Sequence, residues 1–311
     1  MSFRRFVYYC AVCGGCAAYA GWVLGRVFSF ESVLVLSSVR GLLLGLTVAA
    51  ALGAVDAWWN LAALDPRRIA ARAAASGAAG AAGGLLGAAL GQALYDSLHL
   101  EALALFGWVC TGLLVGAAAG AFDVAARLVR REPVGGSLRK PFHAAVGGAA
   151  GGLLGGIIFR LLQALCYRFV IEDTDTFWSP SAWGFVALGL CIGLGVGLAQ
   201  VMLKEAWLRV EEGFRSGREL ILSKDVVTVG RAEICDVGLF GDSGVEPLHA
   251  RLLRRGDGYV IEDVGTAEGT LVNEQRVTEP MALRDGDAVR LGKCVLRFGE
   301  RRTKPPERSE P

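Results

Sequence analysis

Few residues in this chain have the types and spacing that catalysis or metal binding requires. Of three histidines, only His249 lies in the more polar last third of the chain. Cys10, Cys13 and Cys16 have the spacing of an iron–sulfur run, but they fall inside an apolar segment. Successive three-residue steps on a helix also rotate away from a single face. With no Walker loop, nucleophile elbow or set of metal ligands, the sequence predicts a non-enzymatic protein without a cofactor or metal.

Short runs rich in valine, isoleucine and leucine fill the chain between residues 219 and 298. Turn signals separate several of these runs, as at Arg255-Gly256-Asp257-Gly258. Many short apolar runs at this spacing predict an all-β sandwich. The runs cover residues 219–223, 226–229, 249–254, 259–262, 287–291 and 294–298.

Several short motifs follow one another in this region, and together they resemble the forkhead-associated (FHA) family over residues 218–298. The first is Val229-Gly230-Arg231, and an acidic-apolar segment at 235–239 follows it. The next covers residues 245–250 and contains His249. Two loop motifs then occupy residues 263–266 and 269–273, and Arg284-Asp285-Gly286-Asp287 with Leu291-Gly292 closes the pattern.

The resemblance implies a domain that binds phosphothreonine peptides through loops at one end of the sandwich. A dianionic phosphate needs a guanidinium with neutral hydroxyl and amide donors around it. Arg231 supplies the guanidinium, but Glu246 stands at the family's serine position, with Pro247 beside it. Ala267 and Glu268 stand where the family has a hydroxyl and an asparagine. These five residues are the candidates for the phosphopeptide pocket.

Two carboxylates in place of two neutral donors should weaken phosphate binding. Unit charges about 4 Å apart repel by roughly 4 kcal/mol at an effective dielectric near 20. Glu246 could instead pair with Arg231 and leave the arginine a loop-fixing role. The sequence therefore predicts weak or absent dependence on phosphothreonine. The residues expected to brace the loops rather than to touch a ligand are Gly230, His249, Thr266, Gly269, Thr270 and Asn273.

The elements before Lys204 differ sharply from this domain, because they are apolar and rich in glycine. The chain as a whole has a mean hydropathy of +0.44 and 43 glycines. Six segments reach the length, roughly 20 residues, that spans a bilayer. We place them at residues 6–25, 41–59, 77–94, 102–122, 144–165 and 184–202.

The connections between these segments alternate in charge. Acidic residues lie in the loops that follow the third and the fifth segments, at Asp96, Glu101 and residues 172–175. By the positive-inside rule, both termini and the FHA domain should face the cytoplasm. The resemblance to the FHA family and the Ala/Gly-rich composition imply a bacterial inner membrane. Ala18-Tyr19-Ala20 also resembles a signal-peptide cleavage site, although the apolar run continues past it. The basic residues are Arg4, Arg5, Arg67, Arg68, Arg72, Arg127, Arg130, Arg131, Arg139, Lys140, Lys204 and Arg209.

The apolar half contains an internal repeat. The octapeptide GAAGGLLG occurs at residues 80–87 and again at 148–155. At nearly the same offset, the pattern Gly45, Gly53 and Asp56 recurs as Gly112, Gly120 and Asp123, and the last segment repeats it as Gly189, Gly197 and Gln200. Together these matches favour three tandem helical hairpins. Glycines recurring every four residues would let helix backbones approach closely, as in a compact bundle. The alternative is a homo-oligomeric pore or transporter whose helices pack through the same glycines. We expect structural roles for the polar residues of these segments, which are Asp56, Asp123, Gln92 and Arg160.

The sequence thus predicts a six-helix transmembrane bundle of three hairpin repeats (1–203), followed by an all-β FHA sandwich (218–298). A helical linker should join them (204–217), and a disordered tail should follow (299–311). Acidic residues outnumber basic ones between 218 and 298, which argues against nucleic-acid binding. We expect an adaptor at the lipid bilayer that recruits a cytoplasmic protein or phosphoprotein partner. The alternatives are a genuine phosphothreonine reader in a Ser/Thr-kinase pathway and an FHA-regulated oligomeric channel or transporter.

Overall fold

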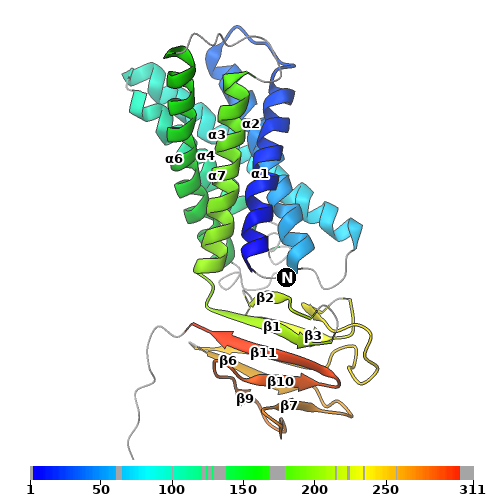
Figure 1. Cartoon of the computed structure of the whole chain (residues 1–311). Coiled ribbons are helices and arrows are strands. Elements are labelled where there is room, and N and C mark those ends of the chain that lie inside the picture. The colour runs from blue at the N-terminus through cyan, green and yellow to red at the C-terminus, as the bar shows by residue number, and fades with distance from the viewer. Residues whose placement is uncertain are drawn as a thin grey trace, which may run out of the picture. The chain divides into compact units, whose positions relative to one another are not determined.

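The chain forms two compact units in the computed structural model shown in Figure 1, one helical and one built of β-strands. The helical unit ends at Met202, and the β unit begins at Leu203. The structure describes residues 3–60, 65–99, 101–120, 124, 128, 138–168, 179–213, 216–222, 225–233, 235–256 and 258–301.

Six helices make up the described part of the helical unit, and five of them are long and apolar enough to cross a membrane. The prediction of spanning segments is confirmed in length and composition for these five. The apolar part of the fourth helix, Leu105–Ala118, is shorter, and residues 121 and 122 of the predicted segment lie outside the described residues. The helices are α1 (Phe3–Gly25), α2 (Val33–Asn60), α3 (Pro66–Leu98), α4 (Glu101–Ala118), α6 (Arg139–Arg168) and α7 (Pro180–Met202).

Helix α3 begins well before the predicted residue 77, because its first turn is capped. The Asp65 side chain accepts a hydrogen bond from the Arg67 N–H at 3.0 Å, and Pro66 occupies the first turn. Proline fits there because its missing N–H would have no helical partner. His99 ends the helix in a left-handed conformation, and its N–H donates to the Tyr95 carbonyl at 2.8 Å. Local capping, rather than hydropathy, sets the length of this helix.

The six helices form a ring in the order α1-α2-α3-α4-α6-α7, and glycines lie at the contact between each pair of neighbours. At each step a Cβ added to a glycine would lie less than 3.0 Å from an atom of the neighbouring helix. Such close approach is available only to small residues, and it supplies van der Waals contact in a setting without a hydrophobic driving force. The contacts, one for each neighbouring pair, are Gly21 with Thr47, Gly45 with Gly80, Gly91 with Gly107, Gly112 with Gly148, Gly147 with Gly195, and Gly189 with Gly14.

The end of the ring near Met202 is filled by apolar side chains and one ion-pair cluster. Leu44, Val48, Leu188 and Ile192 belong to a buried cluster that draws on five of the helices. Asp56 is only 3% exposed, and its carboxylate lies 2.6 Å from the Lys140 ammonium and 3.9 Å from the Arg72 guanidinium. The buried Asp56 carboxylate is thus paired with two cations, as buried charges generally are, and its structural role stays a prediction. Asp123 lies outside the described residues.

The β unit is a sandwich of two sheets. One sheet has the strand order β2-β1-β11-β10-β7-β8, and the other has the order β4-β3-β5-β6-β9. The strands are β1 (Ala206–Glu212), β2 (Glu219–Leu222), β3 (Val226–Gly230), β4 (Val237–Gly238), β5 (Ala250–Arg255), β6 (Gly258–Asp263), β7 (Thr270–Val272), β8 (Gln275–Arg276), β9 (Met281–Ala282), β10 (Ala288–Leu291) and β11 (Cys294–Glu300).

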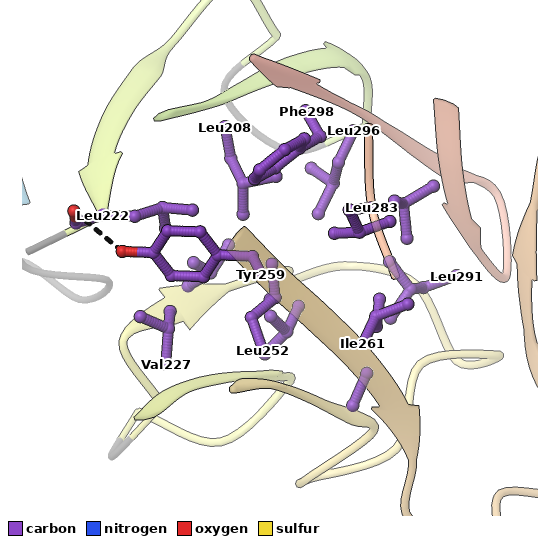
Figure 2. Packing of buried hydrophobic residues seen from close by; sticks show 14 of the residues in the cluster. Leu208, Leu222, Val227, Leu252, Tyr259, Ile261, Leu283, Leu291, Leu296 and Phe298 are labelled. Atoms are coloured by element: carbon purple, nitrogen blue, oxygen red, sulfur yellow. Dashed lines mark hydrogen bonds between the residues drawn. The ribbon is translucent and has the colours of Figure 1, made fainter. Parts of the chain in front are cut away.

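The core of the sandwich lies between the inner faces of these sheets (Figure 2). Leu208 and Phe298 from one sheet meet Leu252 and Tyr259 from the other. The Tyr259 hydroxyl donates a hydrogen bond to the Leu222 carbonyl at 3.3 Å. A buried tyrosine needs such a partner because its hydroxyl loses water on folding. The predicted all-β sandwich is confirmed.

The predicted helical linker over residues 204–217 is wrong. Residues 206–212 form β1, which pairs antiparallel with β11 on one side and with β2 on the other. Ala206, Leu208 and Val210 point inward, at 0%, 1% and 3% exposure, whereas Arg209 is exposed. This alternation has the period of a strand. The sandwich therefore begins at Ala206, and β1 is an interior strand of its larger sheet.

Candidate functional site

The loop after β3 carries Arg231, and backbone hydrogen bonds join it to the loop before β5. The Arg231 N–H donates to the Glu246 carbonyl at 2.8 Å, and the Ala232 N–H donates to the Pro247 carbonyl at 2.9 Å. Gly230 is buried, and a Cβ there would collide with the Pro247 carbonyl oxygen. The approach of the two loops thus depends on glycine at position 230.

His249 joins these loops to the β6–β7 loop from a fully buried position. Its Nδ1 accepts a hydrogen bond from the Glu246 N–H at 3.1 Å. The Nε2 atom lies 3.3 Å from the Thr266 hydroxyl and 3.4 Å from the Gly269 carbonyl. Since Nδ1 is an acceptor, the neutral ring carries its proton on Nε2 and donates it into the β6–β7 loop. His249 thus contacts both loops, and its bracing role stays a prediction.

Asp263 at the end of β6 organises the β6–β7 loop. Its carboxylate accepts hydrogen bonds from the Gly265 N–H at 2.8 Å, from the Thr266 N–H at 2.7 Å, and from the Thr266 and Thr270 hydroxyls at 2.8 and 2.7 Å. Burial acts to raise the pKa of Asp263, but these hydrogen bonds outweigh it and hold the pKa below its usual value. The charged form is thereby favoured in the folded state.

The same loop turns on Gly269, whose φ of +77° lies in the left-handed region. The Gly269 N–H donates to the Thr266 hydroxyl at 3.1 Å. The Arg276 guanidinium donates to the Ala267 carbonyl at 3.3 Å, so β8 also supports the loop. Asp263 and Arg276 were not among the predicted site residues. An aspartate followed by glycine and threonine is a turn signal that could have identified Asp263.

Asn273 belongs to a separate network on the β7–β8 turn. Its side chain donates to the Asp287 carboxylate at 2.8 Å and accepts from the Ala288 N–H at 3.0 Å. Its φ of +48° is a conformation that asparagine tolerates better than most residues. Asn273 therefore braces the turn against β10, whereas Gly230, His249, Thr266, Gly269 and Thr270 brace the loops around Arg231.

The pocket candidates lie on the outer side of this frame. The Glu246 carboxylate accepts a hydrogen bond from the Ala267 N–H at 3.1 Å. Arg231 is exposed, and among the described residues its guanidinium forms no ion pair, so the alternative pairing with Glu246 is absent. Exposed Glu268 places its carboxylate against Gly244, and Pro247 is also exposed. One guanidinium thus stands among loops that carry two carboxylates, and its role toward a ligand stays a prediction.

Comparison with known proteins connects this unit to the family suggested by its motifs. Residues 209–302 match the family model described as inner membrane component of T3SS, cytoplasmic domain. The chain is 31% identical to the FHA domain-containing protein FhaB of Mycobacterium tuberculosis, over 45% of this chain and 96% of that protein. It is 33% identical to the glycogen accumulation regulator GarA of Mycolicibacterium smegmatis, over 30% of this chain and 58% of that protein.

Among solved structures, the FhaA FHA domain complexed with the intracellular domain of Rv3910 is similar to this chain. The identity is 28%, over 30% of this chain and 98% of that one, and the TM-score is 0.28. The identity to FhaB over nearly all of its length, the β-sandwich and the ordered motifs all support the same family assignment. The chain belongs to the FHA-domain family.

Proposed function

We propose that this protein is a membrane-anchored adaptor whose FHA domain recruits cytoplasmic protein partners with little or no dependence on phosphothreonine. Two parts of the proposal rest on different observations. The helices and loop charges support the anchoring, and the chemistry around Arg231 supports the mode of recognition.

Five helices of spanning length and the charges between them support the proposed anchoring. Arg67 and Arg68 flank the start of α3, and Arg139 and Lys140 flank the start of α6, on the same side of the predicted topology as the FHA domain. Positive charge collects on cytoplasmic loops. The match of residues 209–302 to a cytoplasmic domain of an inner membrane component supports this orientation. A cytoplasmic-type reporter fused after Phe298 should be active, whereas an active periplasmic-type reporter there would contradict it.

The position of the Glu246 carboxylate supports the proposed mode of recognition. It accepts the Ala267 N–H, so a backbone donor beside the predicted pocket already has an anionic partner. A phosphate brought to Arg231 would meet this carboxylate and the nearby carboxylate of Glu268. At about 4 Å each such pair costs roughly 4 kcal/mol at a dielectric near 20. This repulsion is comparable to the attraction that charge-assisted hydrogen bonds from Arg231 would give the phosphate.

Calorimetry of fragment 203–301 against a phosphothreonine peptide library tests this proposal. The unchanged domain should bind phosphorylated and unphosphorylated peptides equally or not at all. The double variant Glu246→Ser with Glu268→Asn should gain phosphothreonine binding, because two repulsive charges become two donors. A matched control, Glu279→Ser, removes an exposed carboxylate outside the pocket loops and should gain nothing.

A genuine phosphothreonine reader is the second candidate, and the exposed Arg231 guanidinium favours it. In that case the unchanged domain should bind a phosphorylated peptide at micromolar concentration, and Arg231→Ala should abolish the binding. That pair of results would replace the first proposal with the second.

A further inference from the structure

A cavity of about 740 Å³ occupies the end of the helical ring opposite to the apolar cluster. All six helices contribute to its wall, where α1, α3 and α6 end and α2, α4 and α7 begin. Leu44 lies at its inner end and also belongs to the buried apolar cluster. Since that cluster fills the ring beyond Leu44, the cavity is a closed-ended vestibule and not a through-channel.

Close helix contacts seal the side wall of this vestibule at three of its six seams, α2–α3, α3–α4 and α6–α7. A Cβ on Gly41 would collide with Ala88, so α2 and α3 touch at this level. The ideal Cβ of Gly91 would lie 2.6 Å from the Gly107 Cα, which joins α3 to α4. Gly184 of α7 packs in the same way against the ring of Phe159. A ligand would therefore not pass between the helices of these three pairs.

The lining is cationic and partly aromatic. Arg26, Arg40 and Arg160 reach the cavity from three different parts of the chain, and none of the described lining residues is Asp or Glu. The Arg26 guanidinium lies 5.1 Å from the ring centre of Trp22, which also lines the cavity. Arg160, for which the sequence predicts a structural role, is one of the lining residues. A guanidinium presents a planar fork of donors that matches a carboxylate or phosphate.

Two glutamines complete the polar part of the wall. Gln92 is oriented by a hydrogen bond from its amide nitrogen to the Asp96 carboxylate at 2.8 Å, and Gln163 lines the cavity from α6. The aromatic side chains of Trp22 and Trp108 supply apolar surface beside these groups. A volume in the range of about 300–1,000 Å³, with apolar walls and a few polar groups, is typical of small-molecule sites.

We propose that the vestibule binds a small water-soluble organic anion, a carboxylate or phosphate carried on a flat apolar body. The arginines would hold the anionic group, and the aromatic wall would hold the body. The three closed seams leave no room there for the acyl chains of an anionic lipid, whose headgroup is chemically similar, and the experiment below distinguishes the two sources. This inference does not depend on the FHA proposal, since it concerns the other unit.

Titration calorimetry of the full chain in phosphatidylcholine nanodiscs tests this site. Benzoate should bind saturably, and its neutral analogue benzamide should bind far more weakly. Arg40→Gln and Arg160→Gln, on different helices, should each weaken benzoate binding by about ten-fold, the typical effect of losing a charged hydrogen bond. Arg5→Gln, an exposed arginine at the opposite end of α1, is the matched control and should leave binding unchanged.

Other results would overturn the proposal. Equal binding of benzoate and benzamide would remove the role of charge, and equal affinities in Arg40→Gln and Arg5→Gln would place the site elsewhere. Inorganic phosphate binding as tightly as benzoate would remove the role of the aromatic wall. Loss of benzoate binding in nanodiscs that contain phosphatidylglycerol would identify a lipid headgroup as the occupant. Thermal unfolding of each variant in nanodiscs separates misfolding from lost affinity, and Arg40→Lys, which keeps the charge, should retain part of the binding.

Discussion

Removing β1 should unfold the FHA domain, although the family motifs begin only after it. A fragment cut before Arg218 retains Arg231, His249 and every loop of the candidate pocket. It loses Leu208 and Val210, both of which are almost fully buried. It also leaves β2 without a neighbour, since β1 is the strand that joins β2 to the sheet.

The expected loss is large compared with the stability of a small domain. Leu208, Val210, Leu220 and Leu222 all belong to the buried core. Burying one such side chain contributes about 1.5–3 kcal/mol, so four contribute roughly 6–12 kcal/mol. Domains of this kind are stable by only about 5–15 kcal/mol in total. The fragment that begins at Arg218 should therefore not fold cooperatively.

Urea denaturation followed by circular dichroism compares fragments 203–301 and 218–301. The longer fragment should show a single cooperative transition, and the shorter one should show none. Within the longer fragment, Leu208→Ala should cost about 2–5 kcal/mol. Arg209→Ala, the outward-facing neighbour on the same strand, should cost less than about 1 kcal/mol. Similar midpoints for the two fragments would refute the assignment of β1 to the sandwich.

Three other predictions concern single positions. Gly148→Leu should destabilise the helical ring, because the new side chain would collide with the Gly112 carbonyl. Ile157→Leu, at an exposed position, is the control and should not destabilise it. Thermal unfolding in detergent compares the two variants, and equal midpoints would contradict the packing role of Gly148. The folded-state pKa of Asp263 lies below its unfolded value of about 4, so its stabilisation is complete above that pH and is lost as the pH falls through the folded pKa. Asp263→Asn should therefore flatten the acid side of the stability curve measured by urea titration at several pH values, and an unchanged slope would count against the network. Asn273→Ala should lower the free energy of unfolding by about 1–2 kcal/mol in the same assay, because two hydrogen bonds are lost. Asn273→Gly should lower it less, because glycine adopts the positive φ of this position more easily than alanine does.

The sandwich could be predicted because its motifs encode local geometry. Gly269 needs positive φ, and the Thr266 and Thr270 hydroxyls donate to Asp263, which lies only a few residues before them. Spanning helices could be predicted for a similar reason, since length and apolar composition are enough to indicate them. These features depend on neighbouring residues, and a single sequence therefore shows them.

The missed features depend on contacts between distant residues. The alternation of Ala206, Leu208 and Val210 is short, and its charged flank resembles the end of a helix. It becomes a strand because β11, far along the chain, pairs with it. In the same way, Arg40 and Arg160 lie on helices that are remote in sequence, and only the closure of the ring brings them to one cavity. The absence of an Arg231–Glu246 ion pair likewise depends on side-chain directions that no motif specifies.

The pairing of β1 with β11 also determines when the domain can fold during synthesis. Ala206 pairs with Glu300, so the first strand of the sandwich to leave the ribosome must wait for the last. Until residue 300 has emerged, β1 and β2 can form only a two-stranded ribbon with an exposed edge, which is marginally stable in water. Pairings of this separation fold slowly, and unpaired strand edges aggregate. The nascent chain is therefore most vulnerable to misassembly after the helices are made and before β11 emerges.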